Sequence, residues 1–167
     1  MQELYFIVQT ITNAILVAFL LRLLFQVQRV DFRNPLAQGV VRLTNPVIRP
    51  LRRWLAPIGR LDTASGTALL TVALAKAAVL AELRDFGRPV FAWVAVQAVL
   101  DIADLTLITL LVAVFLHAIM SWLADGFTPA ARITADVAEP LLRPFRRALP
   151  AIAGLDLSPI VVLTLLQ

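Results

Sequence analysis

Long apolar segments alternate along this chain with shorter stretches rich in proline and arginine. Apolar segments cover about residues 4–27 and 64–83, and residues 90–123 are almost continuously apolar. A helix needs about 20 predominantly apolar residues to cross a bilayer, and each of these segments has them. The pattern therefore predicts an all-α, polytopic helical membrane protein.

The stretch after the first apolar segment has a different, amphipathic pattern. In residues 45–57 the apolar positions fall on one helical face and the arginines on the other. We expect Asn45 to cap this helix, Pro46 to occupy its first position, and Pro50 to kink or restart it. Such a helix lies flat at the interface with its apolar face down and its arginines on lipid phosphates.

The same pattern occurs twice. Residues 45–53 align with residues 139–147 at an offset of 94, so Pro144 repeats the place of Pro50. A repeat indicates a duplicated structural unit. We predict two tandem units, 1–88 and 89–167, each with a membrane span followed by a Pro/Arg-rich interfacial helix. The predicted spans are about 4–27 and 64–83 in the first unit and about 99–122 in the second, followed by a short apolar segment at 157–167.

Two segments fit this scheme in more than one way. Residues 90–98 are either an interfacial lead-in or an extension of the third span. The short segment at 157–167 holds about half a span, so it either dips into the bilayer or packs on other helices.

Composition excludes several kinds of site. Hydrophobic residues make up 60% of the chain and charged residues 16%, and the mean hydropathy is +0.84. Soluble proteins have about 45–50% apolar and about 25% charged residues. There are no cysteines and one histidine, which argues against thiolate and zinc sites. With no nucleophile–base pair and no glycine-rich phosphate loop, we expect no enzyme, no metal and no cofactor.

Charge placement predicts the orientation. Residues 28–63 carry seven arginines and residues 126–157 carry four, whereas the N-terminal tip carries none. Positive-inside counting places both basic stretches in the cytoplasm and the N-terminus outside, in a multi-pass membrane protein. The net charge of +4 then reflects contact with anionic phospholipid head groups. Nucleic acid is not an expected partner, because the arginines alternate with lipid-seeking residues and not with stacking aromatics.

Lys76, Asp101 and Asp104 are charged residues inside the predicted second and third spans. Lys76 lies in the second span, and such a residue often marks an ion or proton path. The simpler interpretation is that Lys76 snorkels to the interface or pairs with a carboxylate of the third span. Asp101 and Asp104 share one helical face. They could form a cation site with Lys76, but we expect them to complement the N-terminus of the third span.

Arg22 and His117 occupy equivalent positions in the two copies, about one turn inside the cytoplasmic edge. They could grip a lipid phosphate or sense pH, but we expect both to snorkel to the interface. Trp54, Trp93 and Trp122 suit the aromatic belt of a membrane protein.

The doubled motif resembles a known family. Its residues are Asn45, Pro46, Arg49, Pro50, Arg52 and Arg53 in the first copy, and Glu139, Pro140, Arg143, Pro144, Arg146 and Arg147 in the second. The second copy continues into Leu-Asp-Leu-Ser-Pro at 155–159, where the first reads Leu-Asp-Thr-Ala-Ser at 61–65. At these residues, and over nearly its whole length, the chain resembles the YggT family of small integral membrane proteins.

The resemblance implies a fold more than an activity. YggT-like proteins are associated with bacterial and plastid membranes, and with division or nucleoid organisation, cytochrome assembly, and osmotic or ion stress. We interpret the chain as a non-enzymatic membrane-organising or assembly factor, whose motifs contact anionic lipid or a partner, either a second copy or another membrane protein. The alternative is a small ion channel or transporter component that uses Lys76, Asp101 and Asp104.

Overall fold

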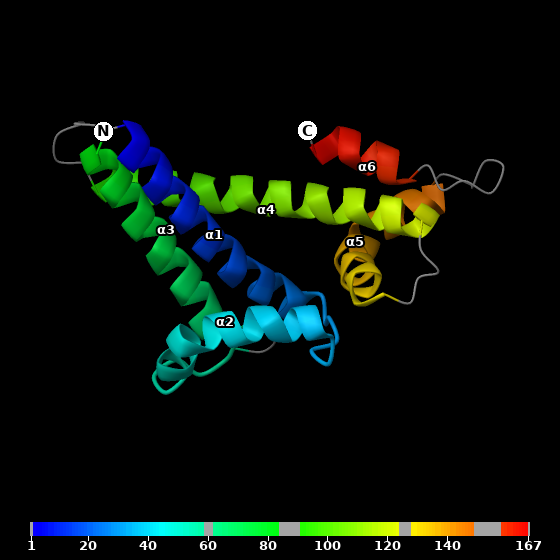
Figure 1. The fold of residues 1–167 in the computed structure, drawn as a ribbon, viewed down its shortest axis with the longest axis horizontal. Helices are drawn as coiled ribbons and strands as arrows, with labels where there is room; N and C mark the ends of the chain where they lie inside the picture. The colour runs from blue at the N-terminus through cyan, green and yellow to red at the C-terminus, as the bar shows by residue number, and fades with distance from the viewer. Residues whose placement is uncertain (1, 59–61, 84–90, 124–127, 149–157, 167) are drawn as a thin grey trace. The chain divides into compact units, whose positions relative to one another are not determined.

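The computed structural model describes residues 2–58, 62–83, 91–123, 128–148 and 158–166, which form six helices and their connections (Figure 1). The helices are α1 (Gln2–Val27), α2 (Pro35–Leu51), α3 (Thr63–Leu83), α4 (Phe91–Leu123), α5 (Pro129–Ala148) and α6 (Ser158–Leu166). Three of them, α1, α3 and α4, are long and apolar enough to cross a membrane. The predicted all-α class is confirmed.

The first two predicted spans match α1 and α3 within two residues at each end, and the third, about 99–122, lies within the longer α4. The sequence left two interpretations of the segment 90–98, and its described residues, 91–98, are a helix extension, since α4 runs without a break from Phe91. The second copy's Leu155-Asp156 lies outside the described residues.

The chain divides into two compact units. The first holds residues 1–23 and 40–106, and the second holds residues 24–39 and 107–167. The boundary between them passes through α1, α2 and α4, so it does not follow the predicted division of the sequence repeat at residue 88. That division remains a prediction about the two copies of the sequence.

Small side chains line the buried face of α3 in the first unit. Ala64, Ala68, Ala73 and Ala77 are all buried. In a membrane, where apolar burial drives association weakly, small residues let neighbouring backbones approach and gain van der Waals contact. The same unit also buries larger side chains, which include Leu16, Phe19 and Leu20 of α1 and Ile48 of α2.

The second unit is held by packing of α6 against α5. Its core consists of Val114 from α4, Ala138 and Leu142 from α5, and Val162 from α6. The short C-terminal segment therefore packs on other helices, one of the two outcomes that the sequence left open.

The helix α2, which contains the first copy of the motif, begins earlier than expected. Asn34 is its N-cap: its Oδ1 accepts a hydrogen bond from the backbone N–H of Leu36 at 3.0 Å, and Pro35 is the first helical residue. The prediction that Asn45 caps a helix starting at Pro46 is therefore wrong. The cap-and-proline pair that starts the helix lies eleven residues upstream of the motif. Likewise, the Oγ1 of Thr128 accepts from the N–H of Ala131 at the start of α5.

The motif prolines lie within the helices. Pro46 and Pro50 are in α2, which ends at Leu51, and Pro140 and Pro144 are in α5, which continues to Ala148. No new helix starts at Pro50 or Pro144. All four prolines are on the exposed side of their helices. The carbonyl groups that lose their N–H donor there face the polar surroundings, which lowers the cost of an internal proline.

The end of α1 is marked by an unusual backbone. Arg29 has a φ of 58°, and the N–H of Val30 reaches back to the carbonyl oxygen of Phe25 at 2.9 Å. This is a helix C-terminal motif that normally places glycine in the left-handed position. An arginine there bears a conformational cost but places a positive charge beside the negative end of the helix dipole.

Candidate functional site

The first copy of the motif is fastened to its own membrane helix by Arg22. The Nη1 of Arg22, on α1, donates to the Oγ1 of Thr44 at 2.7 Å, to the Oδ1 of Asn45 at 3.0 Å and to the backbone oxygen of Val41 at 3.3 Å. Only 4% of Arg22 is exposed. The guanidinium of Arg22 is thus buried against polar acceptors of α2, and its expected snorkelling to the interface stays a prediction.

The other end of the motif is fastened to α3. Arg52 forms a two-point contact with Asp62: its Nη2 lies 2.6 Å from Oδ2 and its Nε lies 3.3 Å from Oδ1. Asp62 is the N-cap residue of α3, since its carbonyl oxygen accepts from the N–H of Gly66. The Oγ of Ser65 also donates to Asp62 Oδ2 at 2.6 Å. The carboxylate of Asp62 thus links the end of α2 to the start of α3.

The environment of Asp62 acts on its charge in two directions. Burial by itself raises the pKa of this carboxyl group, because the side chain is almost fully covered. The hydrogen bonds from Arg52 and Ser65 and the positive charges of Arg52 and Arg22 lower it, and together they prevail. The pKa of Asp62 therefore lies below its usual value, and the group is a stable anion at neutral pH.

The second copy builds its contacts from equivalent positions with different chemistry. Glu139, which aligns with Asn45, forms ion pairs with Arg143 and Arg146. The Nη2 of Arg146 also lies 3.5 Å from the Nε2 of His117, which aligns with Arg22. In both copies the polar residue near the end of a membrane helix therefore lies against the motif that follows it. The second unit places an acid within the motif where the first has an amide.

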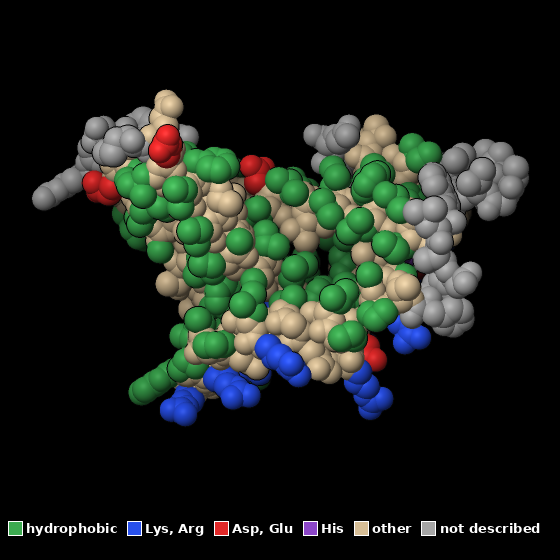
Figure 2. All heavy atoms as spheres, in the orientation of Figure 1, with side chains coloured by type: hydrophobic (Ala, Val, Ile, Leu, Met, Phe, Trp, Pro, Cys, Tyr) green, Lys and Arg blue, Asp and Glu red, His purple; other side chains and the backbone are tan. Residues whose placement is uncertain are grey.

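The outward faces of the motifs carry the remaining arginines. Arg49 and Arg53 are exposed, and so are Arg143 and Arg147 in the second copy. Figure 2 shows positively charged side chains gathered along α2. The motif thus contains arginines of two kinds: Arg52, Arg143 and Arg146 pair with acidic groups of the protein, whereas Arg49, Arg53 and Arg147 form no ion pair with a described residue.

A buried ion pair joins two candidate membrane helices of the first unit. The Nζ of Lys76, on α3, lies 2.8 Å from the Oδ2 of Asp101, on α4. Lys76 is buried and Asp101 nearly so. The interpretation that Lys76 pairs with a carboxylate of the third span is confirmed. Neutralisation by a partner removes much of the cost of an ammonium group among apolar helices.

We expected Asp101 and Asp104 to complement the N-terminus of the third span, and this expectation is wrong. Because α4 begins at Phe91, both residues lie well inside the helix. Asp104 is on the exposed side and does not join the pair of Lys76 and Asp101. The error arose because residues 90–98 extend the helix and move its start away from both carboxylates.

A cavity of about 240 Å³ adjoins this ion pair. Tyr5 and Gln9 of α1 and Trp93 and Gln97 of α4 line it together with the pair, and the Nε2 of Gln97 donates to Asp101 Oδ1 at 3.2 Å. Within the described part of the chain, no group of three or more His, Cys, Asp or Glu side chains could hold a metal ion. The cavity offers polar groups for water or a small ion.

Some participants in these contacts were not singled out from the sequence. Thr44 and Ser65 are short polar residues of a kind that usually occurs at caps and turns, and nothing in their spacing marks them as partners of Arg22 or Asp62. Asp62 carried a signal, because Leu61-Asp62 recurs as Leu155-Asp156. An acid that follows both copies of a basic motif suggests an ion pair, and in the first copy Asp62 forms one with Arg52.

Comparison with known proteins gives one consistent result. The family model described as CCB3/YggT matches residues 1–83 and 96–167. The uncharacterised protein YggT of Escherichia coli K12 is 38% identical over 168 residues, covering 99% of this chain and 86% of that protein. An uncharacterised protein of Pseudomonas aeruginosa is 35% identical over 157 residues, covering 93% and 80%. No solved structure was found to match the chain.

Proposed function

Because the chain belongs to the CCB3/YggT family, we propose that it is a non-enzymatic membrane-organising or assembly factor whose Arg/Pro motifs contact anionic lipid or partner proteins. The proposal places it in the bacterial cytoplasmic membrane, since the relatives are bacterial and three helices are long and apolar enough to span a bilayer. Because these relatives are uncharacterised, the proposal rests on the surface of the protein itself.

The observation that carries the proposal is the three-sided character of α2. One side, with Ala37, Thr44 and Ile48, is buried within the protein. A second side exposes large apolar residues, which recur at helical spacing and continue past the end of the helix: Leu36, Leu43, Val47 and Trp54. The third side carries the exposed arginines Arg42, Arg49 and Arg53, which recur with the same spacing.

An exposed apolar stripe beside a basic stripe is the pattern of a helix at a membrane interface. Trp54 is 88% exposed and Leu43 is 71% exposed, which is costly in water and favourable among acyl chains. Arg42, Arg49 and Arg53 form no ion pair with any described residue, so their charges are available to phosphates. Each such contact with an anionic surface contributes about 1 kcal/mol, or about 3 kcal/mol for the three.

The inward-facing arginines support this role indirectly. Arg52 holds Asp62 and Arg22 holds Thr44, and these contacts fix α2 against α1 and α3. A helix held in this way presents its basic and apolar stripes at a defined depth. This arrangement suits a scaffold, which must offer a constant surface to lipid or to a partner.

The lipid contact is testable with matched charge variants. Arg42, Arg49 and Arg53 would be changed together to Gln, and in a control protein to Lys, and the lipids retained after purification in mild detergent would be measured by native mass spectrometry. We expect the Gln variant to lose phosphatidylglycerol and cardiolipin while the Lys variant keeps them. Equal retention by all three proteins would refute the lipid contact.

The proposed orientation is testable because the chain has no cysteine. Single cysteines at Glu3 and at Arg53 would be probed in intact cells with a membrane-impermeant maleimide. With the N-terminus outside and the motif in the cytoplasm, Glu3→Cys reacts in intact cells and Arg53→Cys reacts only after lysis. The opposite labelling would overturn the orientation.

A second function, ion handling, is favoured by the polar cavity beside Lys76 and Asp101. The pair lies between membrane helices, where ionisable residues commonly mark ion pathways. Potassium and sodium flux into proteoliposomes would be compared for the wild type and Lys76→Ala. Flux that the substitution abolishes supports this function. Flux equal to that of empty liposomes leaves the pair with a structural role and supports the scaffold.

A further inference from the structure

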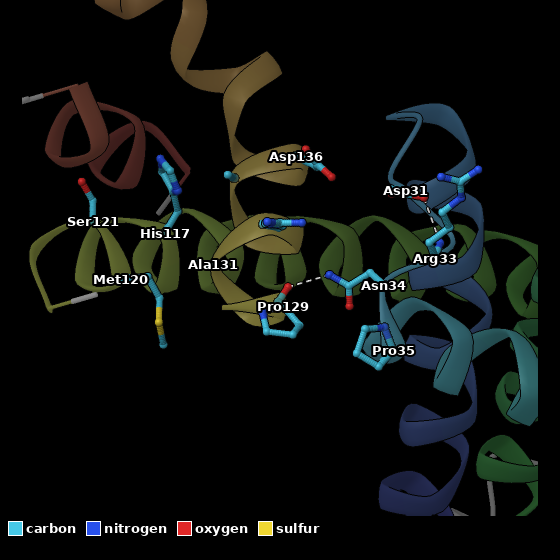
Figure 3. Close-up of a pocket in the computed structure, with 12 residues that line it drawn as sticks. Asp31, Arg33, Asn34, Pro35, His117, Met120, Ser121, Pro129, Ala131 and Asp136 are labelled. Carbon is cyan, nitrogen blue, oxygen red and sulfur yellow. Dashed lines mark hydrogen bonds between the residues drawn. The ribbon is translucent and has the colours of Figure 1, made fainter. Parts of the chain in front are cut away.

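The second unit contains a cavity of about 690 Å³ that the motif residues do not form (Figure 3). Its walls come from the connection after α1, the last turns of α4 and the first turns of α5. This volume is within the range of cavities that bind small molecules. The cavity lies where α4, a candidate membrane span, meets α5, an interfacial helix.

The lining of this cavity carries both signs of charge. Arg33 and Arg132 supply guanidinium groups, and Asp31 and Asp136 supply carboxylates. Figure 3 shows Asp31 and Arg33 on one wall, with Asp136 extending from α5 on the side that faces them. Neither arginine forms an ion pair with a described residue, and neither does Asp136. Because the arginines and carboxylates of the lining do not form ion pairs with one another, they favour a ligand that carries both a negative and a positive group.

The two walls are connected directly. The Nδ2 of Asn34 donates to the backbone oxygen of Pro129 at 2.7 Å, which joins the start of α2 to the start of α5 at the rim of the cavity. The N–H of Arg33 donates to Asp31 Oδ1 at 2.9 Å, which orders the loop. The charged groups are therefore carried by a connected framework, so less ordering entropy is lost when a ligand binds.

An apolar path leads away from the cavity along α4. Met120 lines the cavity, and Leu116 and Val112 follow it at intervals of four residues, which places all three on one helical face. Leu116 and Val112 are both exposed. A ligand with a polar head in the cavity and an apolar tail would find acyl-compatible surface along this face.

We propose that this cavity binds the phosphoethanolamine headgroup of a membrane phospholipid. The phosphate is bound by Arg33 and Arg132, whose planar guanidinium groups can each donate two hydrogen bonds to it. The ammonium group is bound by Asp31 and Asp136, and the acyl chains follow Met120, Leu116 and Val112 along α4.

The charge pattern distinguishes this headgroup from the common alternatives. Phosphatidylglycerol carries only negative charge, so it offers Asp31 and Asp136 neutral hydroxyl groups but no cation, and its phosphate is repelled by them. Phosphatidylcholine has a quaternary ammonium group without N–H donors and cannot hydrogen-bond the carboxylates. A preference for phosphatidylethanolamine over both is the specific consequence.

The test is a competition among lipids. Delipidated protein in detergent would be offered equal amounts of phosphatidylethanolamine, phosphatidylglycerol and phosphatidylcholine with identical acyl chains, and bound lipid would be measured by native mass spectrometry. We expect phosphatidylethanolamine to be favoured about tenfold, as expected for one charge-assisted hydrogen bond. Equal occupancy by the three lipids would overturn the proposal.

Two variants separate the roles of the charges. Arg33→Gln with Arg132→Gln should lose all three lipids from this site. Asp31→Asn with Asp136→Asn should instead move the preference from phosphatidylethanolamine to phosphatidylglycerol, an inversion that misfolding cannot produce. If the second variant keeps the original preference, the carboxylates do not bind the ammonium group and the proposal fails.

Further arms isolate the source of the ligand and the site. Soluble glycerophosphoethanolamine should compete weakly because it lacks acyl chains; competition as strong as that of the lipid would show that the site takes a soluble headgroup, which contradicts a lipid site. Glu3→Gln with Asp104→Asn, which removes the same number of carboxylates as the Asp31 and Asp136 variant but away from the cavity, should leave the preference unchanged. Since the cavity arginines are not those of the motif, the lipid contact of α2 can fail while this site stands.

Discussion

The carboxylate of Asp62 lies 2.6 Å from the guanidinium of Arg52, across the connection between α2 and α3. The contact joins the arginine pair of the motif to the Leu-Asp pair that follows it in both copies. It explains why a basic interfacial sequence ends in an acid: the acid caps the next membrane helix and fixes the motif helix at the same time. The motif is thus a folding element as well as a surface.

Substitution of Asp62 should destabilise the protein clearly. Asp62→Asn removes the charge that Arg52 and Ser65 bind and leaves a poorer acceptor in a buried position, which costs about 1–3 kcal/mol. The measurement is the midpoint of unfolding in detergent. Asp104→Asn, at an exposed carboxylate, is the matched control and should change the midpoint little. Equal effects of the two substitutions would contradict the structural role of Asp62.

The same residue predicts a dependence of stability on pH. Because the pKa of Asp62 is lowered in the folded protein, its unfolded state binds protons more readily. Its contribution is therefore fully present above the unfolded value of about 3.9 and is lost as the pH falls through the lower, folded value. Unfolding midpoints between pH 7 and pH 3 should fall more steeply for the wild type than for Asp62→Asn. Parallel curves would show that another group controls the acid response.

The helices that could be predicted from the sequence are the apolar ones. Residues 4–27 and 64–83 are long apolar segments, and the structure places α1 and α3 there with ends within two residues of those predicted. The start of α2 could not be located in the same way. Asn34-Pro35 and Asn45-Pro46 are both good cap-and-proline pairs, and only tertiary contacts of the intervening turns, such as burial of Ala37, decide between them.

The pair of Lys76 and Asp101 should show strong coupling. Lys76→Leu alone leaves a largely buried carboxylate unpaired, and Asp101→Leu alone leaves a buried ammonium group, so each costs about 3–5 kcal/mol. The double substitution removes both charges and should be close to neutral. A double-mutant cycle measured by unfolding in detergent gives the coupling directly. Additive single effects would show that the two groups do not interact.

The pair of Lys76 and Asp101 could be predicted only in part from the sequence. The placement of Lys76 within a span signalled an unusual residue, and a partner on the third span was a reasonable expectation. Whether Asp101 or Asp104 is that partner depends on the rotation of α4 about its axis, which near-continuous apolarity does not define. In the structure Asp101 turns toward Lys76 and Asp104 is exposed.

The left-handed residue at the end of α1 predicts a stabilising substitution. Arg29 has a φ of 58°, a conformation that costs L-residues about 1–2 kcal/mol and costs glycine little. Arg29→Gly relieves this strain. It also loses the favourable charge at the helix end and gains freedom in the unfolded chain, and both effects are destabilising. The net result should be a slightly higher unfolding midpoint. Arg29→Ala, which loses the charge and keeps the strain, is the control and should lower it. A lower midpoint for Arg29→Gly than for Arg29→Ala would contradict the backbone argument.

The central claim is that α2 lies at the membrane interface with Leu36, Leu43, Val47 and Trp54 among acyl chains and its arginines among phosphates. The most direct test uses the fluorescence of Trp54 in a protein with Trp93→Phe and Trp122→Phe, reconstituted in bilayers that contain phospholipids brominated at defined depths. We predict blue-shifted emission and strong quenching by bromine placed near the headgroup end of the chains. Emission typical of a water-exposed tryptophan, unaffected by brominated lipid at any depth, would contradict the account.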